Sequence, residues 1–235
     1  MKLAVIALVG LFGLSVLAPC RAQDTPRLKM PCAQVVRMGL VKFQQRFSEV
    51  THDDSTQGMI AGSDQYYECR RRVNDAQARR LPARRQQQVR QIRQALNTLG
   101  ETAYDFTDIS AGGGTMWRVG AAYDTAARED VLGALIADLS RPASHSAAAR
   151  RRAELSLAAA RVSFKQLAHP NPTETERQPS HSDYARSYAT SRVALARLET
   201  LVRALPDVPA RRMAGAVAHT LAEPLKEAGP DGGTR

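Results

Sequence analysis

The residues with the clearest chemical potential are the arginines of one segment. Between Glu68 and Arg93 the sequence has nine arginines and two acidic residues, in a chain of 235 residues with a formal net charge of +10. A guanidinium group binds phosphate or carboxylate through two parallel hydrogen bonds, which favours arginine over lysine for capturing anions. The segment therefore predicts an anion-binding surface, whose candidate residues are Arg70, Arg71, Arg72, Arg79, Arg80, Arg84 and Arg85. The alternative is a solvated helix whose arginines have structural partners.

Two cysteines are a second candidate for chemistry. Cys32 and Cys69 are the cysteines that remain if the N-terminal leader is removed. In an oxidising compartment, two such cysteines most simply form one disulfide, and the alternative is a pair of unrelated buried thiols. Neither has a histidine or cysteine at zinc-ligand spacing, so no metal site is expected there.

The histidines and serines carry no recognisable catalytic motif. The five histidines include no H-E-x-x-H pattern, and the chain has no G-x-S-x-G elbow. The run His52-Asp53-Asp54 offers at most a weak site for a divalent ion. We therefore predict no catalytic residue, metal or cofactor, and leave open an enzyme whose groups, such as His52, Asp53 and Glu129, meet only in the fold.

The first residues read as an export signal. Lys2 precedes an apolar run from Leu3 to Ala18, and Cys20-Arg21-Ala22 ends it with a small-x-small pattern. We expect cleavage after Ala22 and export to the bacterial periplasm or the extracellular space. A membrane anchor is less favoured because the run is shorter than the roughly 20 residues that span a bilayer. Lipid attachment at Cys20 is less favoured because proline precedes the cysteine.

The rest of the chain predicts helices. Apolar residues recur every three or four positions, as at Val89, Ile92, Leu96 and Leu99, and no period-2 strand is evident. Helices are expected over 30–50, from Ser63 to Val73, over 82–100, 115–139 and 146–168, and in two stretches from 183 to 224. The fold class is therefore all-α, a helical bundle of six to seven amphipathic helices.

Loop signals divide this bundle. Residues 51–62 and 101–114 are rich in turn formers, and three prolines interrupt 169–182. We expect a signal peptide at 1–22, a helical region with the disulfide at 23–140, an Ala-rich helix with a Pro-rich linker at 141–182, a helical hairpin at 183–228 and a flexible tail at 229–235.

The expected helix and the expected disulfide conflict. A helix from 32 to 50 is about 28 Å long, whereas bridged cysteines need Cα atoms within about 7 Å. The 51–62 loop is therefore expected to run back along the first helix and bring Cys69 to Cys32.

These observations favour a non-enzymatic binding or interaction module. Its partner would be an anionic lipid, a polyanion or an acidic protein at the cell envelope, recognised by the segment 70–93. Nucleic acid is not expected, because no aromatic residue follows Tyr67 in the segment to stack on bases. The alternatives are the envelope enzyme described above and a structural scaffold or homo-oligomer. A scaffold would be marked by an exposed apolar patch on the helix at 117–139, whose apolar residues lie on two faces.

Overall fold

The protein is all-helical over the part that the structure describes. The computed structural model describes residues 26–111, 115–140, 147–167 and 181–205, and all but 210, 213 and 217 of residues 209–219. Within these ranges there is no strand, which confirms the predicted fold class. The helices are α1 (Cys32–Met38), α2 (Leu40–Thr51), α3 (Thr56–Ala78), α4 (Ala83–Ala111), α5 (Thr115–Ser140), α6 (Ala147–Leu167) and α7 (His181–Arg203).

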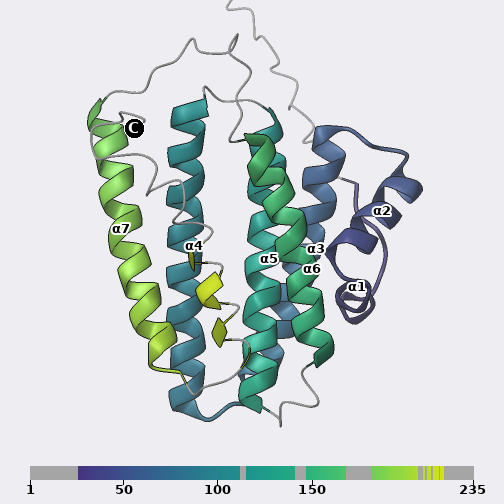
Figure 1. Cartoon of the computed structure of the whole chain (residues 1–235). Helices are drawn as coiled ribbons and strands as arrows, with labels where there is room; N and C mark the ends of the chain where they lie inside the picture. Colours follow the sequence, from purple (N-terminus) through teal and green to yellow (C-terminus); the bar gives the residue numbers. More distant parts are fainter. Residues whose placement is uncertain are drawn as a thin grey trace, which may run out of the picture.

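Helix α5 is the centre of the bundle. It packs against α3, α4 and α6, while α7 packs on α4 (Figure 1). Short α1 and α2 lie on the flank, against α3. The apolar residues of 117–139 were expected to lie on two faces of a helix, and α5 is covered by several neighbours. None of the described helices is long and apolar enough to cross a bilayer.

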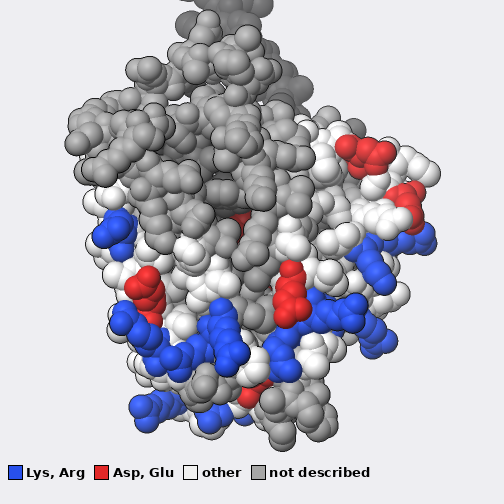
Figure 2. Space-filling view, in the orientation of Figure 1, with Lys and Arg blue, Asp and Glu red and all other residues white. Residues whose placement is uncertain are grey.

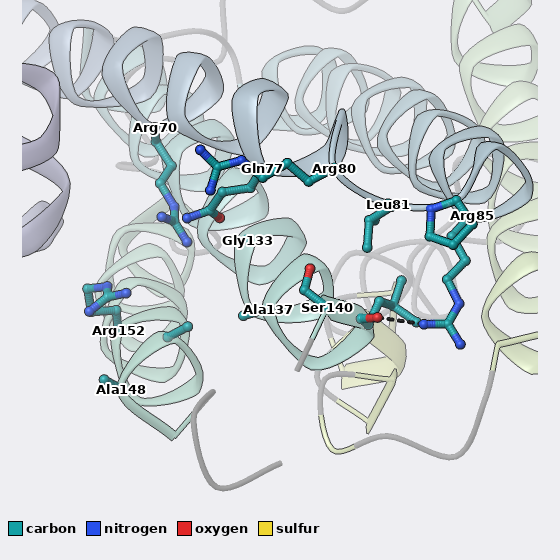
Figure 3. A pocket seen from close by; sticks show the side chains of 13 residues that line it. Arg70, Gln77, Arg80, Leu81, Arg85, Gly133, Ala137, Ser140, Ala148 and Arg152 are labelled. Atoms are coloured by element: carbon teal, nitrogen blue, oxygen red, sulfur yellow. Dashed lines mark hydrogen bonds between the residues drawn. The ribbon is translucent and has the colours of Figure 1, made fainter. Parts of the chain in front are cut away.

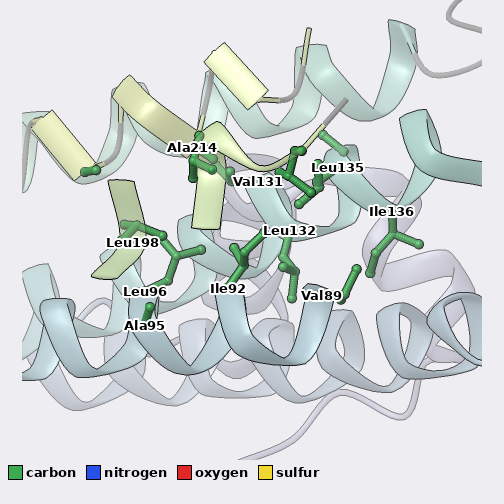
Figure 4. Close-up of a cluster of buried hydrophobic side chains, with 14 of the residues drawn as sticks. Val89, Ile92, Ala95, Leu96, Val131, Leu132, Leu135, Ile136, Leu198 and Ala214 are labelled. Atoms are coloured by element: carbon green, nitrogen blue, oxygen red, sulfur yellow. The ribbon is translucent and has the colours of Figure 1, made fainter. Parts of the chain in front are cut away.

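The predicted apolar stripes form the core. On α4, Val89, Ile92 and Leu96 are buried against Leu132 of α5 and Leu198 of α7 (Figure 4). Each buried side chain of this size stabilises the fold by about 1.5–3 kcal/mol. A second cluster joins α1, α2 and α3, and its largest members are Tyr66, Phe43, Phe47 and Leu40.

The expected first helix and the loop after it are wrong. The chain breaks at Gly39, whose φ of +80° suits glycine, so that α1 and α2 are separate helices. Helix α3 begins at Thr56, seven residues before the expected cap Ser63, because the Ser55 side chain accepts the Gly58 N–H. The turn-forming residues of 56–62 therefore lie inside a helix. Gly62 is there because a Cβ at this position would lie 2.4 Å from the Oε1 atom of Gln44.

The break at Gly39 permits the disulfide. Cys32 and Cys69 are bonded, with their Cα atoms 4.7 Å apart, as predicted. The route differs from the expected one. At 1.5 Å per residue, α3 rises about 20 Å from Thr56 to Cys69, roughly the length of α2. Helix α3 itself, and not a loop, thus runs back along α2 to the start of α1.

The expected end of a helix at Gly100 is also wrong. Helix α4 continues to Ala111, so residues 101–111 are helical and not a connection. A Cβ on Gly100 would lie 2.1 Å from the Cζ atom of Arg128, so this glycine makes room for a buried guanidinium. The expected signal peptide, most of the linker and the C-terminal tail lie outside the described residues.

Candidate anion-binding site

The seven predicted arginines do not form one surface. Arg70 is only 2% exposed. Arg85 is half-buried and donates a hydrogen bond to the Leu139 carbonyl. The other five are exposed, and none of them pairs with a carboxylate in the described part of the chain: Arg71, Arg72, Arg79, Arg80 and Arg84.

Arg70 belongs to a buried charge network in the middle of the bundle. Its Nε atom lies 2.8 Å from Oδ1 of Asp130 on α5, and both side chains are almost fully buried. The Tyr66 hydroxyl donates to Asp130 Oδ1 and Oδ2 at 3.0 and 2.9 Å, and the Ser156 hydroxyl of α6 donates to Oδ2. Burial, and then the charge of Asp130, raise the pKa of Tyr66. The carboxylate is therefore stabilised by two hydroxyl donors, from α3 and α6, and by the charge of Arg70.

A glycine on α5 makes this arrangement possible. A Cβ on Gly133 would lie 1.8 Å from Nη2 of Arg70 and 2.6 Å from Oδ1 of Asn74. These separations are far below van der Waals contact, so only glycine lets the guanidinium lie against the α5 backbone.

A second buried network contains Glu129, one of the three residues considered above as groups of a possible enzyme. Glu129 Oε1 lies 2.7 Å from Nε of Arg93, and Asn74 Nδ2 donates to Glu129 Oε2 at 2.8 Å. His52 and Asp53 lie at the α2–α3 turn, where Asp53 accepts the Ser55 N–H at 2.9 Å. The side chain and the amide of Ser55 both lower the pKa of Asp53. Glu129 is thus engaged in structural pairs with Arg93 and Asn74, and Asp53 in a local turn.

A cleft of about 570 Å³ opens beside Arg70. Small side chains leave this space: Gly133 and Ala137 on α5, and Ala148 and Ala149 on α6. In Figure 3, Arg70 and Arg152 are at one end of the cleft and Arg85 is at the other. Its described lining contains four arginines and no carboxylate: Arg70, Arg80, Arg85 and Arg152.

Sequence reasoning missed Arg152. It ends the run Arg150-Arg151-Arg152 at the start of α6, a second arginine cluster that could have drawn attention. Arg150 pairs with Asp138 at 2.7 Å, and Arg151 is exposed. The Nε atom of Arg152 is buried and has no hydrogen-bond partner among the described residues. Burial and then the charge of Arg70 lower the pKa of Arg152.

Basic side chains gather at one end of the bundle. At this end α4 and α6 begin while α5 ends (Figure 1), and Figure 2 shows a band of lysine and arginine across the same region. Neither α4 nor α6 has an acidic residue in its first turn. The free N–H groups at the start of a helix attract anions. The arginines at the starts of α4 and α6 add to this positive potential, and no acidic residue in the first turn of either helix reduces it.

No group of three metal-ligating side chains occurs among the described residues. Comparisons of the chain with protein-family models, with curated proteins and with solved structures find no significant match.

Proposed function

We propose that the protein is an exported, non-enzymatic module that binds an anionic surface of the cell envelope through the basic end of its bundle. The observation that carries the proposal is the set of exposed arginines without carboxylate partners in the described chain, of which Arg79, Arg80 and Arg84 lie at the α3–α4 turn. The disulfide is consistent with export, because disulfides persist in oxidising compartments.

The distribution of these arginines favours a lipid bilayer as the partner. The arginines lie at the ends of several helices and not along one groove, so they suit a broad charged surface. Each basic residue near an anionic membrane contributes about 1 kcal/mol. The attraction should weaken as salt rises, since the Debye length falls from about 10 Å at 0.1 M to 3 Å at 1 M.

Vesicle binding with two charge-matched variants tests the proposal. One variant carries Arg79→Gln and Arg84→Gln, and the control carries Arg37→Gln and Lys42→Gln, which remove two exposed positive charges elsewhere. On vesicles of phosphatidylcholine and phosphatidylglycerol, we expect the first variant to bind about 30-fold more weakly, from about 2 kcal/mol of lost attraction. The control should stay within about threefold of the native protein.

Three results would contradict the proposal. Equal weakening of the two variants would mean that net charge alone governs binding. Unchanged binding of the Arg79 and Arg84 variant would remove the basic end from consideration. Binding to heparin with none to vesicles would make the partner a polyanion and not a membrane.

A further inference from the structure

The end of the cleft at the buried Arg70 and the half-buried Arg152 has an excess of positive charge. Two guanidinium groups lie there, and the carboxylate beside them is that of Asp130. This carboxylate already receives the Tyr66 and Ser156 hydroxyls and pairs with Nε of Arg70. One carboxylate therefore lies beside two guanidinium groups and acts on both, so this end of the cleft keeps a net positive charge.

Both arginines also keep donors available to a ligand. No hydrogen bond joins Nη1 or Nη2 of Arg70 to the described part of the chain, although the residue is 98% buried and lines the cleft. Nor does any residue of that part of the chain accept a hydrogen bond from the buried Nε atom of Arg152. A buried donor without a partner costs about 1–3 kcal/mol, and more when it is charged. A bound oxyanion would accept these hydrogen bonds and balance the charge.

We propose that the cleft binds a phosphate group between the guanidinium groups of Arg70 and Arg152. Two guanidinium groups facing one tetrahedral oxyanion can each donate two N–H bonds to it. The cleft is much larger than a bare phosphate ion and falls within the usual range for small-molecule sites, about 300–1,000 Å³. The phosphate therefore belongs to an ester with a small organic group, which lies over Gly133, Ala137 and Ala149.

The inference extends the proposed function, since it gives the same anion-binding module a specific small site. The two are separable in experiment. Arg79 and Arg84 do not line the cleft, although their sequence neighbours Arg80 and Arg85 do. Vesicle binding can thus fail while phosphate binding succeeds, and the reverse.

Calorimetric titration with inorganic phosphate and with glycerol 3-phosphate, at constant ionic strength, tests the site. The variant is Arg152→Gln, which removes a side chain that has no ion pair within the described part of the chain and so leaves the hydrogen bonds of the buried network in place. The control is Arg151→Gln, an exposed neighbour outside the cleft. We expect both probes to bind the native protein, glycerol 3-phosphate more tightly. We expect Arg152→Gln to raise Kd at least tenfold, and Arg151→Gln to change it less than twofold.

Thermal unfolding gives a second readout. Phosphate should raise the Tm of the native protein and of Arg151→Gln, because a ligand that binds only the folded state stabilises it. It should not raise the Tm of Arg152→Gln. In phosphate-free buffer, Arg152→Gln should unfold at or above the native Tm, because it relieves the repulsion between the guanidinium groups of Arg70 and Arg152.

Vesicles containing phosphatidic acid or phosphatidylglycerol distinguish a lipid from a soluble source of the phosphate. Selective binding to phosphatidic acid that is competed by glycerol 3-phosphate and lost in Arg152→Gln would assign the site to a monoester headgroup. Binding of the soluble probes without this selectivity would assign it to a soluble ester. Absence of phosphate binding, equal losses in the Arg151 and Arg152 variants, or a lower Tm of Arg152→Gln in phosphate-free buffer would overturn the proposal.

Discussion

Replacing Gly133 with alanine tests whether the Arg70–Asp130 pair depends on a missing side chain. The new methyl group would lie 1.8 Å from Nη2 and 2.5 Å from Cζ of Arg70, so the guanidinium must move. Its present position places Nε 2.8 Å from Asp130, and any displacement weakens that pair. The substitution therefore acts on the buried network while leaving every charged residue present.

The expected loss of stability combines two destabilising effects with one stabilising effect. Overpacking a buried site costs about 1–3 kcal/mol, and breaking a buried ion pair costs about 3–5 kcal/mol. Alanine in place of glycine in a helix gains about 1 kcal/mol. Since Arg70 can relax in part, we expect a net loss of about 2–3 kcal/mol, and a Tm lower by about 4–12 °C in a protein of this size.

Urea unfolding followed by circular dichroism measures this loss. The matched control is Gly215→Ala, because no heavy atom of the described residues lies within 4 Å of the added Cβ there. The control should be as stable as the native protein or up to about 1 kcal/mol more stable. When Arg70→Met and Asp130→Asn are present, at least half of the Gly133→Ala penalty should disappear, since its main cause is then absent. A Gly133→Ala protein of native stability, or a penalty unchanged by those substitutions, would refute the reasoning.

Three further predictions concern stability. Changing Cys32 and Cys69 together to serine should lower the free energy of unfolding by about 3–4 kcal/mol, because the bridge joins residues 37 apart in sequence; an unchanged urea midpoint would contradict this. Ser55→Ala should cost about 1 kcal/mol in urea unfolding by removing the cap of α3, whereas native stability would mean that the cap is dispensable. The pKa of Tyr66 is raised in the folded protein, so its contribution is present below the unfolded value near 10 and is lost as the pH rises above it. Stability measured from pH 8 to 11 should thus fall more steeply for the native protein than for Tyr66→Phe, and equal slopes would exclude this origin.

Patterns within one helix allowed much of the fold to be predicted. The stripe of Val89, Ile92, Leu96 and Leu99 is buried as expected, because helical periodicity determines which side of a helix is apolar. Residues 56–62 were predicted wrongly because their glycines resemble a turn. In the structure, Gly58 and Gly62 are required by contacts with Asp53 and Gln44, which no local pattern reveals.

The candidate site was only partly predictable for a similar reason. Charge density singled out Arg70, Arg80 and Arg85, which do line the cleft, but also arginines that face solvent elsewhere. What separates Arg70 from Arg71 is the position of Asp130, sixty residues away on another helix. The proposed role of Arg152 likewise depends on Asp130, which already pairs with Arg70 and accepts hydrogen bonds from Tyr66 and Ser156. Such relations depend on tertiary packing and cannot be predicted from local sequence patterns.

The placement of the second apolar cluster has a consequence for the order of assembly. Its buried members come from residues 35–69, apart from Ala126 of α5. Contacts between residues close in sequence form quickly, since little chain entropy is lost in closing short loops. We therefore expect α1, α2 and α3 to associate first. At that stage Arg70 and Asn74 would not yet contact Asp130 and Glu129 of α5. When α5 docks, only the alignment that brings Asp130 to Arg70 and Glu129 to Asn74 satisfies both, so the buried charges select the register in which the two halves of the bundle join.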